Sequence, residues 1–207
     1  YGDTDSVMFT IPGVTGGDCD AWGKRLAAEL SELFPPPMKV EFEKAMRMLS
    51  FTKKRYASYL IKADGSYVLI KGTNIPYILV RGITIARRDN CRLLVDTYTD
   101  LLRCILDKKG IVHGYSIIIA AVLKLLRGEV DPIKELSVVK TINAQYKSQT
   151  CQMKVFADKL TKEGKPQQPG TRASYLVLAD EDDNTNKAKR LGEKMILDED
   201  YNPDEHK

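Results

Sequence analysis

Two aspartates one residue apart, Asp3 and Asp5, lie between a Tyr-Gly pair and an apolar run at residues 7–9. Residues two apart in a strand point to the same face, whereas in a tight turn between two strands they flank the reversal. In either geometry the two carboxylates lie within several ångströms of each other, which costs free energy unless a cation compensates their charge. The stretch therefore predicts a short strand or hairpin that carries a cation site.

The chemistry of these donors indicates which cation to expect. Carboxylate oxygens without a nearby histidine or cysteine favour a hard ion, so we expect Mg²⁺ or Mn²⁺ at this pair. Mg²⁺ keeps several waters and takes one or two protein carboxylates, usually beside substrate phosphates. The pair thus indicates phosphate chemistry, but an isolated Asp-x-Asp is equally typical of a solvated turn, and both interpretations stay open.

The composition is that of a globular chain. Its 207 residues suffice for one medium domain or two small ones, and 43% of them are hydrophobic. No apolar run approaches the ~20 residues that cross a bilayer, and no signal peptide is visible, so we expect no membrane partner. The four cysteines are far apart in the sequence, which argues against a zinc site or a disulfide framework. Because the chain starts at Tyr1 inside the expected hairpin, we expect a fragment of a longer protein.

Charge is unevenly distributed along the chain, whose formal net charge is +4. Residues 39–92 hold 12 basic and 4 acidic residues, whereas residues 180–207 hold 5 basic and 10 acidic ones. A concentrated basic segment is the electrostatic footprint of a nucleic-acid partner, although a solvated basic face has the same composition. The acidic run from Asp180 to Asp183 is predicted to be a solvated loop.

The basic segment contains three consecutive cations followed by an aromatic residue, Lys53-Lys54-Arg55-Tyr56. On a strand or at its edge, such cations can contact phosphates while the ring contacts a sugar or a base. An ordinary basic turn is the alternative interpretation of the same four residues.

Taken together, these stretches resemble one family. Residues 1–6, Tyr-Gly-Asp-Thr-Asp-Ser, resemble the third polymerase motif of the family B (alpha-like) DNA polymerases, which lies on a palm hairpin. Residues 53–57, Lys-Lys-Arg-Tyr-Ala, resemble the stretch with which that family contacts template–primer DNA, and their distance of some fifty residues from the Asp pair fits the family. The resemblance spans nearly the whole chain.

The chain also departs from the family pattern. A Lys-Gly and an Arg-Arg-Asp stand close together in the family as one short motif at the palm–thumb junction. Here Lys71-Gly72 and Arg87-Arg88-Asp89 are separated in the sequence. This departure suggests a divergent, viral branch, and it leaves open whether Lys71 or Arg81 matches the family's lysine.

The resemblance implies a DNA-directed DNA polymerase, in which a primer 3′-hydroxyl attacks the α-phosphate of a deoxynucleoside triphosphate beside two Mg²⁺ ions. It implies that Asp5 binds metal and that Asp3 is a catalytic carboxylate with a less direct part. Four further residues of the motif would shape it, namely Tyr1, Gly2, Thr4 and Ser6. The residues that would grip DNA are Lys53, Lys54, Arg55, Tyr56, Lys71, Arg87 and Arg88.

The implied partners are primer–template DNA and a deoxynucleoside triphosphate, with room for a processivity factor. The implied location is intracellular, at the site of DNA replication in the nucleus or in a viral replication compartment. The family's first palm aspartate and its nucleotide-binding lysine helix lie upstream of the motif at residues 1–6. We therefore expect residues 1–207 alone to lack polymerase activity.

The expected fold class is α+β, with the end of an antiparallel palm sheet and a packed helix at residues 1–88, followed by a mainly helical thumb at residues 89–207. Apolar spacing and turn residues predict the individual elements. The elements are strands at 6–11 and 38–44, a helix at 20–34, a hairpin of 56–62 and 67–71 that turns at Asp64-Gly65, helices after Asp89 and at 115–127 and 145–160, and a strand at 172–178.

Two other functions fit parts of the sequence. Residues 3–7 match the Asp-x-Asp-x-(Thr/Val) pattern of haloacid-dehalogenase-like phosphatases, in which Asp3 would be the nucleophile. That fold alternates strands and helices, with which the helix-rich second half disagrees. The other alternative is a non-catalytic DNA-binding module, in which both aspartates would be dispensable.

Overall fold

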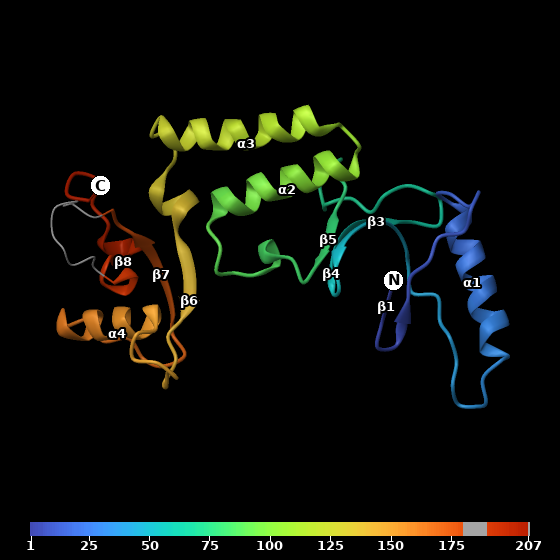
Figure 1. Ribbon diagram of the computed structural model, residues 1–207, viewed down its shortest axis with the longest axis horizontal. Helices are drawn as coiled ribbons and strands as arrows, with labels where there is room; N and C mark the ends of the chain where they lie inside the picture. Colours follow the sequence, from blue (N-terminus) through green and yellow to red (C-terminus); the bar gives the residue numbers. More distant parts are fainter. Residues whose placement is uncertain (180–189, 207) are drawn as a thin grey trace. The chain divides into compact units, whose positions relative to one another are not determined.

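The structure is a computed structural model that describes residues 1–179 and 190–206 (Figure 1). The chain divides into two compact units, of which the first contains Tyr1–Ala86 with Leu102–Ile111 and the second Arg87–Leu101 with Val112–Lys207. Both units combine helices with antiparallel strands, so the expected α+β class is confirmed. The assignment of residues 1–88 to a palm and 89–207 to a thumb stays a prediction, and the run 180–183 lies outside the described residues.

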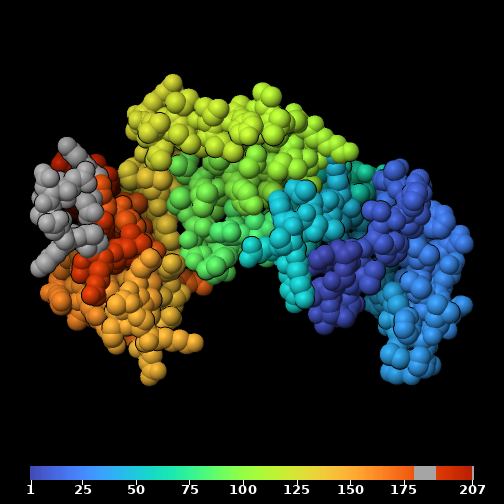
Figure 2. All heavy atoms as spheres, in the orientation of Figure 1, coloured from blue at the N-terminus to red at the C-terminus, as the bar shows by residue number. Residues whose placement is uncertain are grey.

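The first unit begins with a short hairpin of β1 (Gly2–Asp3) and β2 (Ser6–Val7). The second strand is shorter than the predicted 6–11: Gly2 pairs with Val7, and beyond that pair only Tyr1 and Met8 exchange backbone hydrogen bonds among the described residues. Figure 2 shows the dark blue atoms of this hairpin beside the cyan atoms of the sheet that follows, which the contacts between Tyr1 and Lys54 confirm.

The sheet of the first unit has three antiparallel strands in the order β3-β4-β5, which span Ala45–Thr52, Arg55–Ile61 and Ile78–Arg81. The middle strand β4 is buried along residues 56–59, as expected of a strand with a neighbour on each side. The predicted hairpin turn at Asp64-Gly65 is confirmed, since the Gly65 amide donates to the Lys62 carbonyl at 2.9 Å. The second branch of this hairpin, predicted at 67–71, is not a regular strand. It takes part in two isolated bridges, which join Ile61 to Tyr67 and Leu69 to Pro76.

Helix α1 (Asp18–Ser31) confirms the helix predicted at 20–34, but the strand predicted at 38–44 is wrong. The ring of Phe42 lies against Gly23 of α1, where a Cβ would come within 2.1 Å of the ring. The Ser31 side chain binds the backbone of Val40, since its Oγ accepts a hydrogen bond of 2.8 Å from the Val40 amide. The stretch 38–44 is therefore held to a helix through Phe42 and the Val40 backbone, and it forms no strand.

Helix α2 (Arg92–Leu106) ends in the first unit. Its last residues bury Leu102 and Leu106, and the Arg103 guanidinium donates to the Pro76 carbonyl at 3.2 Å. The Tyr59 side chain, only 1% exposed, lies near Asp107 just beyond this helix. Residues 102–107 therefore cover the sheet of the first unit.

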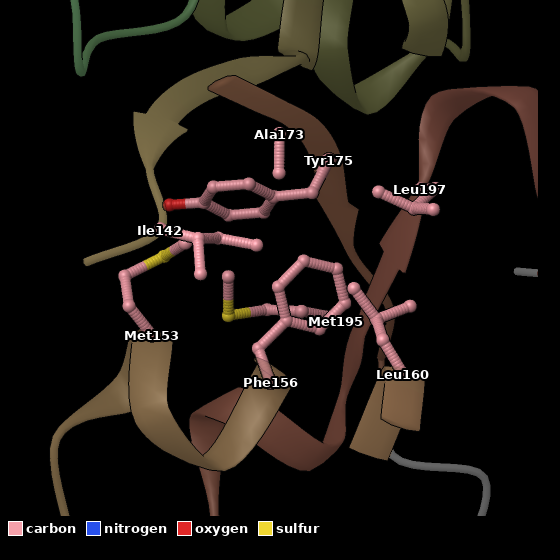
Figure 3. Packing of buried hydrophobic residues seen from close by; sticks show 8 residues of the cluster. All are labelled: Ile142, Met153, Phe156, Leu160, Ala173, Tyr175, Met195 and Leu197. Atoms are coloured by element: carbon pink, nitrogen blue, oxygen red, sulfur yellow. The ribbon is translucent and has the colours of Figure 1, made fainter. Parts of the chain in front are cut away.

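The second unit contains α3 (Ile111–Leu126) except for its first residue, and α4 (Gln152–Lys162). Its sheet has the order β6-β7-β8, whose strands span Val138–Thr141, Arg172–Val177 and Met195–Leu197. Figure 3 shows its core, in which α4 packs on the sheet and the rings of Phe156 and Tyr175 lie 5.7 Å apart. Helix α4 starts later than the predicted 145, because the Tyr146 hydroxyl accepts from the Asn143 amide and holds the chain in a turn.

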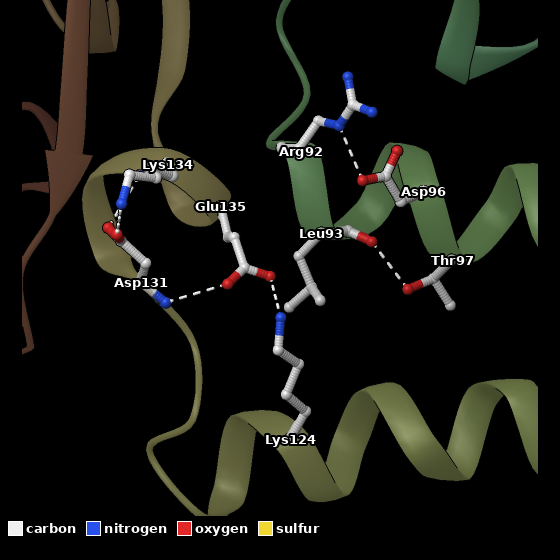
Figure 4. Close-up of polar contacts among 8 residues, drawn as sticks. All are labelled: Arg92, Leu93, Asp96, Thr97, Lys124, Asp131, Lys134 and Glu135. Atoms are coloured by element: carbon white, nitrogen blue, oxygen red, sulfur yellow. Dashed lines mark hydrogen bonds and ion pairs between the residues drawn. The ribbon is translucent and has the colours of Figure 1, made fainter.

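A short helical turn, Pro132–Leu136, follows α3 (Figure 4). Asp131 caps it by accepting from the Lys134 amide at 3.1 Å, which is the expected use of an Asp before a proline at the first helical position. Glu135 accepts from the Asp131 amide and pairs with Lys124 of α3. Among the described residues, no helix is both long enough and apolar enough to cross a bilayer.

Candidate active site

The Asp pair lies at the tip of the β1–β2 hairpin, whose two-residue loop is Thr4-Asp5. Two-residue hairpin loops need a positive φ at their first position to match the twist of the strands, and Thr4 has a φ of 56°. This conformation is uncommon for a β-branched residue, so the loop is strained, as backbone at functional sites often is. The Ser6 hydroxyl donates to the Asp3 carbonyl at 3.1 Å and closes the turn.

The two carboxylates differ in their surroundings. Asp3 is half-buried, and its Oδ1 accepts from the Thr4 hydroxyl at 3.2 Å and lies 3.3 Å from the Lys54 ammonium nitrogen. Asp5 is exposed, and within the described part of the chain no hydrogen bond or ion pair engages its carboxylate. Asp3 is therefore already neutralised by a protein cation, whereas Asp5 keeps its lone pairs for another ligand.

The partner of Asp3 lies in the tight loop between β3 and β4. A register shift between Ser50 and Thr52 bulges β3 just before this loop, and Lys54 has a φ of 61°. A left-handed residue after such a turn is usually glycine, so a lysine there keeps a charged side chain at a backbone cost of about 1–2 kcal/mol. Lys53 and Arg55 flank it and are exposed.

Tyr1 joins the hairpin to this loop. Its phenolic oxygen accepts a hydrogen bond of 2.7 Å from the Lys54 amide, and its ring meets the buried Tyr56 ring edge-on, with centroids 6.2 Å apart. Its backbone pairs with Met8, whose amide donates to the Tyr1 carbonyl at 2.7 Å. The two stretches that the sequence singles out, residues 1–6 and 53–57, are therefore in direct contact.

The structure separates the two candidates for the family's lysine. Arg81, at the end of β5, pairs in register with Tyr56 and so lies beside the basic loop. Lys71 lies in the loop closed by the bond between the Ile70 amide and the Ile75 carbonyl. From Pro76 to Arg81 the chain runs five residues along the sheet, roughly 17 Å at about 3.3 Å per residue. Arg81 is thus brought to the candidate site and Lys71 is not.

Arg87 and Arg88 belong to the second unit, and both are exposed. The Arg87 guanidinium donates two hydrogen bonds, of 3.0 and 2.8 Å, to the carboxylate of Asp89. This pair holds the pKa of Asp89 below its usual value, with the charge of Lys140 in the same sense. Arg88 has no such carboxylate partner among the described residues.

The donor set fits part of a Mg²⁺ site. Asp5 supplies an unengaged carboxylate, and a carboxylate or two beside substrate phosphates is the usual protein share of such a site. The described residues contain no group of three or more His, Cys, Asp and Glu side chains that could hold a metal ion. These residues can therefore supply part of the ligand set of a metal site, but not all of it.

Gly82 carries no signal of its own in the sequence, where it is one more turn residue at the end of a strand. Arg81 stands there only as an alternative to Lys71. Only the pairing of β4 with β5 brings both residues beside the basic loop. The phosphatase alternative is not supported, because the hairpin and both larger sheets are antiparallel and lack the alternation that this fold needs.

Curated relatives extend over most of this chain. The DNA polymerase delta catalytic subunit of Candida albicans is 29% identical over 181 residues, which cover 86% of this chain and 17% of that protein. A DNA polymerase of Thermococcus sp. (strain 9oN-7) is 28% identical over 211 residues, covering 100% of this chain and 24% of the relative. A DNA polymerase of Invertebrate iridescent virus 6 is 30% identical over 126 residues, covering 53% of this chain and 10% of the viral protein.

This chain therefore spans between about a tenth and a quarter of the length of these relatives, which are both cellular and viral. The family model for DNA polymerase family B matches residues 1–206, almost the whole chain. The chain belongs to DNA polymerase family B.

Proposed function

We propose that this chain forms the end of the palm and the thumb of a DNA-directed DNA polymerase, with the palm at residues 1–88 and the thumb at 89–207. The observation that carries the proposal is the ion pair of 3.3 Å between Asp3 and Lys54. It joins a carboxylate hairpin suited to a metal ion with a cationic loop suited to a phosphate backbone. Family membership over residues 1–206 supports the same assignment.

The proposal gives the two aspartates different tasks. Asp5, whose carboxylate is exposed and unengaged among the described residues, would bind Mg²⁺. When bound, Mg²⁺ would stabilise the negative charge that develops on the phosphate oxygens during nucleotidyl transfer. Asp3 would hold the Lys54 ammonium group at the edge of the site, because the two are already paired.

The basic loop would hold the primer–template duplex. Lys53, Lys54 and Arg55 are consecutive and exposed, and the ring of the buried Tyr56 that follows them packs against Tyr1. Contacts of this kind to phosphates position a duplex without reading its sequence, as a polymerase that copies any template requires. Arg81 extends this surface, and Arg88 supplies a further cation in the second unit.

The substrates that follow are primer–template DNA and a deoxynucleoside triphosphate, with a processivity factor as a further partner. The place of action is wherever the DNA concerned is replicated. Residues 1–207 alone would not catalyse primer extension, because one unengaged carboxylate cannot hold two metal ions and a triphosphate. Primer extension by this chain alone would contradict that part of the proposal.

The test compares Asp5→Asn with Asp3→Asn in a full-length polymerase that contains this chain. Removing the metal ligand should lower the rate of primer extension by a factor on the order of 10³ or more, a loss of about 4 kcal/mol in transition-state stabilisation. Asp3→Asn should reduce the rate less and should weaken binding of the primer end, because Lys54 loses its partner.

The same variants separate the alternatives. A phosphatase would release phosphate from a monoester and would lose that activity with Asp3→Asn. A non-catalytic DNA-binding module would bind duplex equally well in both variants. Either result, in place of the loss with Asp5→Asn, would overturn the proposal.

A further inference from the structure

Gly82 lies against the backbone of the basic loop. It follows directly after β5 and has a φ of 62°. A Cβ at this position would lie 2.1 Å from the carbonyl oxygen of Lys54 and 3.3 Å from Cγ of Arg55. The nearest obstacle is backbone, which cannot swing aside as the end of a side chain can. Any residue other than glycine must therefore push the Lys54 carbonyl away.

Lys54 makes two contacts with the hairpin that carries the Asp pair. Its amide donates to the Tyr1 hydroxyl at 2.7 Å, and its ammonium nitrogen lies 3.3 Å from Asp3 Oδ1. Its φ of 61° is one that a lysine adopts only when its surroundings hold it there. The amide and the side chain of Lys54 thus have partners in the hairpin, while its carbonyl rests on Gly82.

We propose that Gly82 is a positioning residue of the active site, which acts through Lys54. Glycine at 82 lets β5 approach the loop closely enough to fix the Lys54 carbonyl, and this fixes the side chain of Lys54 beside Asp3. The inference rests on the proposed function, because it gives Gly82 a task only if Lys54 contributes to DNA binding and primer extension.

The expected effect of Gly82→Ala follows from this geometry. The new methyl group displaces the Lys54 carbonyl, so the amide of Lys54 leaves the Tyr1 hydroxyl and its ammonium group leaves Asp3. We expect kcat for primer extension to fall at least tenfold and the Kd for primer–template duplex to rise, with KM for the deoxynucleoside triphosphate little changed. A merely structural role would lower the amount of folded enzyme without this split between kcat and KM.

Gly128→Ala is the matched control. Gly128 has a φ of 68°, so alanine there is strained to a similar degree, but nothing lies within 4 Å of its Cβ position. It follows α3 and lies outside the candidate site. Gly128→Ala should lower the melting temperature and leave kcat for primer extension unchanged. An equal loss of kcat in both variants would overturn the inference, since backbone strain alone would then explain it.

The decisive measurement repeats Gly82→Ala in a Lys54→Ala background, in the full-length polymerase. If Gly82 acts through the Lys54 side chain, the second substitution lowers the melting temperature but reduces kcat no further, because effects along one chain of contacts are not additive. A further tenfold loss would overturn the inference and leave the proposed function standing. Normal primer extension by Lys54→Ala itself would overturn the proposed role of Lys54, and this inference with it.

Hydrogen exchange on the wild-type enzyme tests the same contact without depending on how the variant folds. The Lys54 amide, bonded to Tyr1 and held by Gly82 from the other side, should exchange much more slowly than the Lys53 amide. Equal, rapid exchange of the two amides would overturn the inference.

Discussion

The backbone amide of Lys54 donates a hydrogen bond of 2.7 Å to the phenolic oxygen of Tyr1, across 53 residues of sequence. The same tyrosine packs its ring against Tyr56, so one side chain fixes the hairpin that carries the Asp pair against the loop that carries the cations. The contact joins the two motifs, and most of the behaviour expected under the proposed function follows from it.

Tyr1→Phe removes the acceptor and keeps the ring contact with Tyr56. A single hydrogen bond of this kind stabilises a fold by about 0.5–1.5 kcal/mol, so the melting temperature should fall only slightly. The Lys54 amide should exchange faster, and primer extension should slow several-fold, because the loop then shifts relative to Asp3. Tyr77→Phe is the control, since the exposed Tyr77 has no hydrogen-bond partner for its hydroxyl among the described residues and should change neither quantity.

Arg81→Ala and Lys71→Ala separate the two candidates for a DNA contact. Each phosphate contact that is lost should reduce the slope of log affinity against log salt by roughly 0.9. We expect this reduction for Arg81→Ala, because Arg81 pairs in register with Tyr56, and no reduction for Lys71→Ala. Duplex binding titrated at several salt concentrations gives both slopes. A reduced slope for Lys71→Ala alone would show that the duplex contacts the loop that carries Lys71 and not the end of β5.

Local patterns were sufficient for the elements that local interactions determine. Helical spacing of apolar residues predicts α1, and Asp64-Gly65 predicts the turn after β4, because a positive φ there favours glycine. The alternating pattern of residues 38–44 misleads for a tertiary reason, since Phe42 packs on Gly23 and the stretch joins no sheet in the described part of the chain. Strand β8 (Met195–Leu197) is too short to show a period of its own.

The candidate site was predictable residue by residue but not as an assembly. The resemblance singles out Asp3, Asp5 and the basic loop, and it offers Arg81 as an alternative to Lys71. The contact of Tyr1 with Lys54 joins positions 53 residues apart, and the approach of Gly82 depends on the pairing of β4 with β5. Such non-local contacts leave no periodic trace in a single sequence.

Gly23→Ala should destabilise the first unit, although alanine normally stabilises a helix by about 1 kcal/mol over glycine. The reason is that a Cβ at 23 would meet the Phe42 ring at 2.1 Å, and overpacking of this kind costs about 1–3 kcal/mol. Unfolding in denaturant measures the change. Phe42→Ala in the Gly23→Ala background should recover part of the loss, and a stabilising effect of Gly23→Ala by itself would contradict the packing described.

The raised pKa of Tyr59 predicts that the fold loses stability at high pH. Burial, followed by the nearby charge of Asp107 and a hydrogen bond to it, raises the pKa of Tyr59 from 10.0 to about 12. The contribution of the Tyr59 phenol to the free energy of unfolding is complete below pH 10.0 and is lost as the pH rises towards 12. The reason is that the unfolded chain releases the phenolic proton at a lower pH than the folded chain does. The free energy of unfolding should therefore fall more steeply over that range in the wild type than in Tyr59→Phe. Identical slopes would contradict the burial of the phenol.

The most direct test of the account is local cleavage by Fe²⁺ in place of Mg²⁺, in a full-length polymerase bound to primer–template DNA. With added hydrogen peroxide and ascorbate, Fe²⁺ held by carboxylate oxygens reduces the peroxide to hydroxyl radicals that cut nearby backbone, ascorbate returns the iron to Fe²⁺, and such sites bind Fe²⁺ as well as harder ions. We predict cuts in the protein near residues 3–6 and 53–56, cuts in the DNA at the primer end, and loss of all of them in Asp5→Asn. Cuts that persist in Asp5→Asn, or that fall away from both the hairpin and the basic loop, would contradict the claim that a metal ion at Asp5 and DNA on the basic loop share one site.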